Sequence, residues 1–145
     1  MPTRKPEFHP GVDMMAGILI VCHCNLGREL ISAAELILGR VENSDFMAIS
    51  QLSESEELLK VIAQKIDSLD RGKGVLVLTD MFGGTPSNLS LSFLNDERVE
   101  VLTGVNLPMV ISAVQWRDSL SLKELGEKAE CEGRRSITLA GSMIK

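Results

Sequence analysis

Aromatic residues are scarce in this chain, which has no tyrosine, one tryptophan and four phenylalanines among its 145 residues. Hydrophobic residues nevertheless make up 44% of the sequence, so any core must be largely aliphatic. A chain of this length is long enough to bury such a core within one domain. The composition is that of an ordinary globular protein.

Long apolar runs and an excess of basic residues are also missing. No stretch approaches the roughly 20 apolar residues that span a bilayer, and the net charge is −5 with both signs interspersed. These features argue against direct membrane insertion and against a nucleic-acid surface, which needs a basic stripe. Residues 1–15 lack the apolar centre of a signal peptide, and we expect a disordered leader or extension there, followed by a domain over 16–145.

Cysteine is limited to Cys22, Cys24 and Cys131. An odd number without an export signal indicates a reducing compartment, so we expect a cytoplasmic protein. The triplet Cys22-His23-Cys24 has poor spacing for a metal site, because adjacent strand residues point to opposite faces. The sequence therefore predicts no bound metal, and nothing in it calls for a cofactor.

Short apolar runs alternate with helical patterns along the chain. Apolar runs typical of strands covered on both faces occur at residues 16–22 and 74–79, and further strands are expected at residues 46–49 and 99–103. Three- and four-residue apolar spacings predict helices between them, with Gly39 as a stop and Ser-x-x-Glu capping boxes at Ser53 and Ser121. A short last strand is expected at residues 137–140.

This order predicts a single-domain α/β fold. We expect a mainly parallel sheet of about four strands plus the short C-terminal strand, with helices on both faces. In such sheets the loops at the carboxyl ends of the strands build the site. If the first and third strands are neighbours, His23 and Asp80 flank the point where the chain changes direction across the sheet.

His23 is a candidate nucleophile at the tip of the first strand, although a lone histidine beside an apolar strand is more often structural. A nucleophilic imidazole presents one bare nitrogen while the other holds a proton. Asp80 could accept that proton's hydrogen bond, fix the tautomer and stabilise the cation that forms. The alternative is that Asp80 is a turn residue or a helix cap.

The segment Gly83-Gly84-Thr85 could bind a phosphoryl group. Glycines permit close backbone approach, successive N–H groups can surround an anion, and Thr85 adds a hydroxyl donor. The segment is not a P-loop, and the chain contains no G-x-G-x-x-G. A Gly-Gly-Thr-Pro turn is weak evidence by itself.

Together these motifs resemble the IIA component of the mannose family in the phosphoenolpyruvate-dependent sugar phosphotransferase system. The matching stretches are GILIVCHCNLGREL, LTDMFGGTPSNLS and LTGVNLPMV, and the resemblance covers roughly residues 16–140. It implies a phosphohistidine carrier in which His23 is phosphorylated and Asp80 is its hydrogen-bonding carboxylate. Thr85 falls where the family has a hydroxyl residue close to the phosphoryl group.

Cys24 departs from the family pattern, in which glycine usually follows the active histidine. The resemblance further implies that the histidine phosphocarrier protein donates the phosphoryl group. A separate IIB protein would receive it for sugar uptake and phosphorylation, in association with a membrane permease complex. The sequence does not name the sugar. The resemblance also implies a homodimer that exchanges the strand near residues 137–140.

Two other functions stay open. A phosphorylated His23 could act as a regulatory signal or as the phosphoryl donor to a dihydroxyacetone kinase system, whose phosphotransferase subunit has a similar domain. Alternatively, the crevice could bind a small anion or nucleotide without any transfer. The second alternative needs neither His23 nor Asp80, so the presence of both residues argues against it.

Overall fold

The computed structural model describes residues 15–50 and 54–144 and shows an α/β fold with one parallel sheet. The sheet has the order β2-β1-β3-β4 and consists of β1 (Gly17–His23), β2 (Ser44–Ile49), β3 (Val75–Thr79) and β4 (Val99–Thr103). The helices are α1 (Leu26–Leu38), α2 (Ser55–Leu69), α3 (Thr85–Leu91), α4 (Leu107–Trp116), α5 (Leu122–Arg135) and the short 3-10 helix η1 (Ala140–Met143). The predicted fold class and its four main strands are confirmed.

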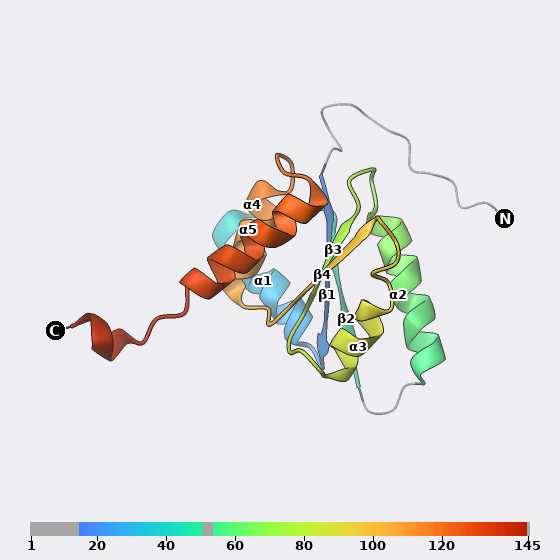
Figure 1. The fold of residues 1–145 in the computed structure, drawn as a ribbon, viewed down its shortest axis with the longest axis horizontal. Coiled ribbons are helices and arrows are strands. Elements are labelled where there is room, and N and C mark those ends of the chain that lie inside the picture. Colours follow the sequence, from blue (N-terminus) through green and yellow to red (C-terminus); the bar gives the residue numbers. More distant parts are fainter. Residues whose placement is uncertain (1–14, 51–53, 145) are drawn as a thin grey trace.

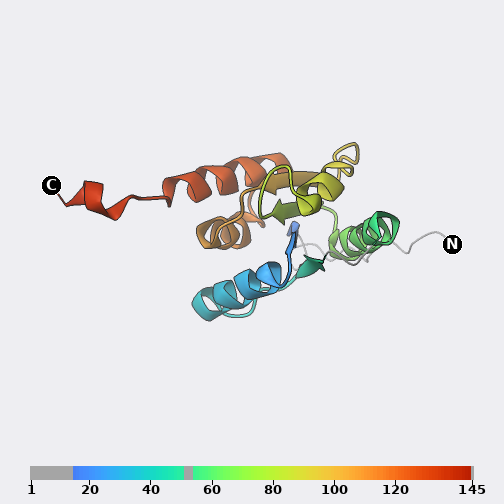
Figure 2. The same ribbon diagram turned by 90° about the horizontal axis from the view of Figure 1, so that it is seen from below.

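Helices cover both faces of the sheet, with α1, α4 and α5 on one side and α2 and α3 on the other (Figures 1 and 2). Strand β1 runs through the middle and alternates between the two cores. Ile18 and Ile20 face the first core, and Leu19 and Val21 face the second. A central strand buried on both faces explains why its sequence is a continuous apolar run.

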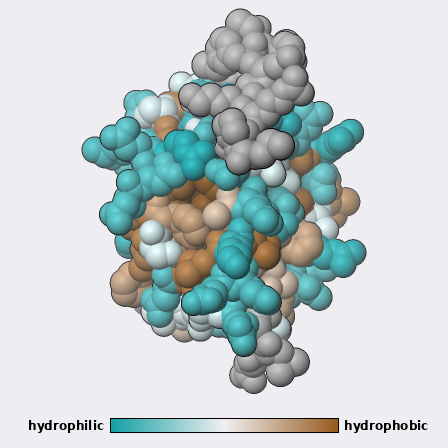
Figure 3. All heavy atoms as spheres, turned by 90° about the vertical axis from the view of Figure 1, so that its right-hand side faces the viewer, coloured by the Kyte–Doolittle hydropathy of each residue, from teal (hydrophilic) through white to brown (hydrophobic). Residues whose placement is uncertain are grey.

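Helix α2 covers its face of the sheet through one apolar stripe. Leu58, Ile62, Ile66 and Leu69 line the buried stripe of α2 and pack against the sheet. Figure 3 looks onto this side and shows apolar residues gathered among hydrophilic ones. Helices α2 and α3 therefore leave some apolar residues exposed on this side of the molecule.

Two of the predicted helix-end signals are confirmed. At the start of α5, Ser121 Oγ accepts the Glu124 N–H at 3.2 Å and Glu124 Oε1 accepts the Ser121 N–H at 3.1 Å, which completes the predicted capping box. Gly39 ends α1 with a positive φ of 84°. Ser53 lies outside the described residues, and α2 follows Glu54, whose side chain makes no capping bond.

The predicted strand at residues 137–140 is wrong for the single chain. Residues 137–139 form no regular element, and η1 follows them. Both ribbon views show the segment after α5 running away from the sheet (Figures 1 and 2). A strand needs a neighbouring edge to pair with its backbone groups, and the segment has left every edge of its own sheet.

Residues 1–14, most of the predicted leader, lie outside the described part of the chain. Within the described part, no helix has the length and apolar character needed to cross a membrane.

Candidate functional site

The site lies where β1 and β3 end side by side. Val21 of β1 pairs with Thr79 of β3, so the next residues of each strand leave the sheet at the same edge. His23 is the last residue of β1, and Asp80 directly follows β3. From this position the chain continues to β2 on one side of β1 and to β4 on the far side of β3. The predicted switch point is therefore present.

His23 and Asp80 meet through two hydrogen bonds to one carboxylate oxygen. Asp80 Oδ2 lies 2.8 Å from His23 Nδ1 and accepts the His23 backbone N–H at 2.9 Å. The other oxygen, Oδ1, accepts the Met81 backbone N–H at 3.1 Å. The carboxylate is thus fixed by three donors, and it holds both the backbone and the ring of His23.

This arrangement assigns the tautomer of the imidazole. Burial alone would raise the pKa of Asp80, but the hydrogen bonds from the His23 backbone and ring outweigh it and lower that pKa below its usual value. Asp80 is consequently a carboxylate at neutral pH, and a carboxylate only accepts hydrogen bonds. Nδ1 must therefore carry the proton, which leaves Nε2 of the neutral ring bare. The side chain of His23 is 46% exposed, whereas that of Asp80 is 13% exposed.

Gly84 lies against the imidazole. A Cβ atom added at Gly84 would come within 3.1 Å of His23 Cε1, so a side chain here would press on the ring. Gly83 is exposed and has a φ of +87°, a conformation that favours glycine. Thr85 is the exposed first residue of α3. The structure thus brings His23, Asp80 and Gly84 together, and Gly83 and Thr85 flank Gly84 in the same turn.

The two cysteines beside His23 have different environments. Cys22 is buried, and burial followed by the negative charge of Asp80 raises the pKa of its thiol to about 12. Cys24 is exposed and has a φ of 52°, in the left-handed region where glycine is favoured. This backbone conformation would suit a glycine at the position after His23. In the part of the chain that the structure covers, no group of three or more His, Cys, Asp or Glu side chains could hold a metal ion.

The loop after β4 reaches the same edge but serves the packing of helices. The Val105 N–H donates to the Thr79 carbonyl at 2.9 Å. Asn106 Oδ1 accepts the Met109 N–H at 3.0 Å, and its Nδ2 donates to the Gly133 carbonyl at 3.0 Å. Asn106 thus caps the start of α4 and ties this helix to α5. The asparagine of the GVNLP stretch therefore has a structural role here.

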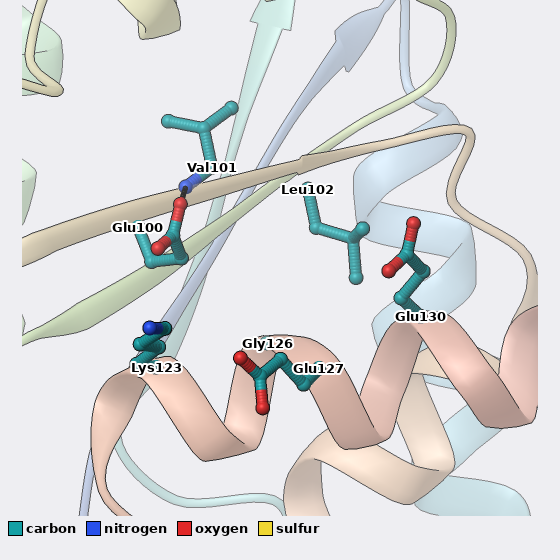
Figure 4. Close-up of a pocket in the computed structure, with 7 residues that line it drawn as sticks. All are labelled: Glu100, Val101, Leu102, Lys123, Gly126, Glu127 and Glu130. Carbon is teal, nitrogen blue, oxygen red and sulfur yellow. Dashed lines mark hydrogen bonds between the residues drawn. The ribbon is translucent and has the colours of Figure 1, made fainter.

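A groove runs along β4 and α5 (Figure 4). Its walls come from these two elements, and the residues that line it are Glu100, Val101, Leu102, Lys123, Gly126, Glu127 and Glu130. None of the predicted site residues lines this groove. It borders β4, which has a neighbour on only one side in the sheet of the described residues.

Two buried hydroxyls, those of Thr79 and Ser87, lie beneath the site and were not predicted from the sequence. Thr79 Oγ1 lies 2.6 Å from Ser87 Oγ, and both residues are fully buried. For Thr79 the sequence does contain a signal, because it is the single polar residue in the run Val75–Thr79 of β3. Ser87 lies in the seven-residue helix α3, where a serine by itself carries no such signal.

The fold and the site define an α/β domain that presents an aspartate-bound histidine at the carboxyl edge of a parallel sheet. The family model described as "PTS system fructose IIA component" matches residues 17–130. The chain belongs to this family, which confirms the resemblance to phosphotransferase-system IIA components.

Individual relatives agree with this assignment. The mannose-specific EIIAB component of Escherichia coli K12 is 33% identical over 126 residues, covering 86% of this chain and 39% of the relative. The chain thus spans about two fifths of that protein's length. The fructose-specific EIIA component of Bacillus subtilis is 26% identical, with 90% of each chain covered. A crystal structure of phosphotransferase system component EIIA from Streptococcus agalactiae has a TM-score of 0.80 and 30% identity, covering 88% of this chain and 99% of that one.

Proposed function

We propose that this protein is a cytoplasmic phosphocarrier of a sugar phosphotransferase system. It accepts a phosphoryl group on Nε2 of His23 from the histidine phosphocarrier protein and passes it to a IIB protein for sugar uptake. The observation that carries this proposal is the 2.8 Å contact between His23 Nδ1 and Asp80 Oδ2. It holds the proton on one nitrogen and leaves the other as a nucleophile on a half-exposed ring.

In the transfer step, the Nε2 lone pair forms a bond to phosphorus while the phosphorus–nitrogen bond of the donor phosphohistidine breaks. Nδ1 keeps its proton, so the ring of His23 becomes an imidazolium that carries the phosphoryl group. The Asp80 carboxylate stabilises this positive charge directly, because its Oδ2 already lies at hydrogen-bond distance. Transfer to the IIB protein reverses these changes.

We further propose that Gly83, Gly84 and Thr85 surround the phosphoryl group. Gly84 already lies beside Cε1 of His23, the ring carbon bonded to both nitrogens. The absence of a side chain at Gly84 lets the backbone approach the ring, and the exposed Thr85 hydroxyl is available as a donor. Phosphoryl transfer depends mainly on positioning and charge stabilisation of this kind.

The proposal is tested by incubating the protein with phosphoenolpyruvate and the general phosphotransferase proteins. Intact mass measurement should show the gain of one phosphoryl group. A purified IIB protein of this family should then remove it. A phosphoryl group that passes only to a dihydroxyacetone kinase system would support the role of phosphoryl donor to that system. A phosphoryl group that passes to no acceptor would support a regulatory role. A protein that gains no mass with an active donor system would contradict the proposal.

We also propose that the domain spans residues 16–145 and forms a homodimer through the segment after α5. This segment exposes apolar side chains that a monomer leaves in water: Ile137 and Leu139 are 77% and 79% exposed. Among the described residues, β4 pairs with a strand on one side only, and its other side borders the groove of Figure 4. The segment of one subunit would cover the edge of the other, which satisfies both features.

Removing the residues after Arg134 should convert the dimer into a monomer. The reason is that the truncation deletes the exposed apolar segment while leaving the sheet and its two cores in place. Light scattering at micromolar concentration would measure the change. Ile137→Ser should weaken the dimer too, whereas Leu36→Ser, which alters an apolar side chain that is 89% exposed on α1, should not. A full-length protein of monomer mass would exclude the dimer.

A further inference from the structure

A directional hydrogen-bond chain lies beneath the turn that follows β3. The Ser87 hydroxyl donates to the Met81 carbonyl, since a carbonyl can only accept. Ser87 Oγ also lies 2.6 Å from Thr79 Oγ1. Because the single Ser87 hydrogen is already engaged, Thr79 must be the donor in that contact. The order is therefore Thr79 to Ser87 to the Met81 carbonyl.

The Met81 peptide links this chain to the site. Its carbonyl accepts from Ser87 and, more weakly, from the Gly84 N–H at 3.4 Å. On the other side of the residue, its N–H donates to Asp80 Oδ1 at 3.1 Å. Asp80 in turn holds the ring of His23. A continuous set of contacts thus joins the last residue of β3 to the imidazole.

Both hydroxyls are buried, so each of them needs a hydrogen-bond partner within the protein. Thr79 and Ser87 are each 0% exposed, and they lie between β3 and α3. A buried hydroxyl is costly unless it is hydrogen-bonded, and an apolar side chain of similar size would avoid that cost. Here each hydroxyl has a hydrogen-bond partner. The Ser87 hydroxyl, the last donor of the hydrogen-bond chain, bonds to the Met81 carbonyl in the turn and not to a carbonyl within α3.

We propose that Thr79 and Ser87 are positioning residues for His23: their hydroxyl chain fixes the turn at residues 80–84 and thereby holds Asp80 on Nδ1. The inference rests on the proposed phosphoryl transfer for its kinetic consequence, whereas its structural consequence is the tautomer of His23. Neither residue touches the imidazole in the contacts above, so their effect is transmitted through Met81 and Asp80.

The test compares Ser87→Ala with Ser90→Ala. Ser90 is an equally buried serine of α3, but its hydroxyl bonds to the Pro86 carbonyl within the helix. Ser87→Ala should slow phosphorylation about tenfold, because small misplacements of a reacting group are costly. The loss should fall on the rate constant and not on the KM for the phosphorylated donor. Ser90→Ala should transfer at the rate of the unmodified protein.

A second readout does not depend on phosphorylation. Nitrogen-15 NMR of the histidine ring should show a proton on Nδ1 and a bare Nε2 in the unmodified protein and in Ser90→Ala. Ser87→Ala should show a mixture of tautomers. A folded Ser87→Ala with unchanged rate and unchanged tautomer would overturn the inference while leaving the phosphocarrier proposal intact. Absence of phosphorylation in the unmodified protein would instead contradict the phosphocarrier proposal, and the tautomer comparison would still decide the inference.

Ser87→Cys covers the case in which Ser87→Ala does not fold. A thiol fills the space of the hydroxyl, although sulfur is larger than oxygen, and it is a weaker donor than a hydroxyl. Ser87→Cys should therefore transfer the phosphoryl group more slowly than the unmodified protein, but with less than the tenfold loss expected for Ser87→Ala. It should also show a partial loss of the Nδ1–H tautomer of His23. Unchanged values for both quantities would count against the positioning role.

Discussion

Replacing His23 with alanine should abolish phosphorylation of the chain. The imidazole supplies a bare nitrogen on a ring that a charge-stabilising carboxylate holds. Neither Asp80, which accepts three hydrogen bonds, nor the buried thiol of Cys22, whose pKa is raised to about 12, offers a comparable nucleophile. Intact mass measurement after incubation with the donor system should show no added phosphoryl group.

The control for this variant is His9→Ala, which changes the other histidine of the sequence. It should be phosphorylated to the same extent as the unmodified protein. The bond should also be acid-labile and alkali-stable, as expected for a phosphoramidate. A phosphoryl group found on His23→Ala, or a bond that is acid-stable and alkali-labile, would contradict the assignment of His23 as the phosphorylated residue.

Asp80→Asn should slow phosphorylation by about a hundredfold or more. The amide oxygen of asparagine could still accept the two bonds from His23, but it carries no charge to stabilise the imidazolium. Its NH₂ group could instead donate to Nδ1, which would favour the tautomer with the proton on Nε2. Both changes weaken the nucleophile without removing a side chain from the core.

Asp96→Asn provides a matched control for the loss of a carboxylate. Asp96 also has a lowered pKa, caused first by the hydrogen bond from the Arg98 side chain. It lies just before β4, at the end of the sheet away from His23. Rapid-quench measurement of phosphoryl transfer should show a large loss for Asp80→Asn and a normal rate for Asp96→Asn. Equal rates for the two variants would show that the charge of Asp80 is dispensable.

The sequence predicted the sheet well because the two central strands, β1 and β3, are apolar runs up to their last residue. β4 begins and ends as expected, while β1 and β3 differ by about one residue. β2 was the least accurate, since it begins at Ser44 and not at residue 46. Its first residues are polar, and Asp45 pairs with Lys65 of α2 at 2.7 Å. A polar strand start at a sheet edge is not distinguishable from a loop by hydrophobicity.

The segment after α5 shows the opposite limit. Its apolar residues, including Ile137 and Leu139, have the composition of a short strand, but they form none in the single chain. Strand formation depends on an edge that accepts the backbone hydrogen bonds, and that information is not local. The local sequence pattern thus indicated a strand, but the segment forms none because no strand edge of its own chain pairs with it in the described structure.

For the site, topology was sufficient to place His23 beside Asp80. Both residues follow apolar strands that parallel connections bring to one edge, and the 2.8 Å contact has the predicted geometry. Sequence could not assign the two ring nitrogens, because that requires knowing which one the carboxylate faces. It also missed Thr79 and Ser87, since a serine in a short helix has no distinguishing pattern.

The most direct measurement of the central claim is the position of phosphorus on the ring. NMR of the phosphorylated protein, with nitrogen-15 in its histidines, would identify the nitrogen coupled to phosphorus. We expect phosphorus on Nε2 of His23 and a proton on Nδ1, with Nδ1 still bonded to Asp80. Phosphorus on Nδ1 would contradict the account, because that nitrogen cannot carry a phosphoryl group and donate to Asp80 at the same time.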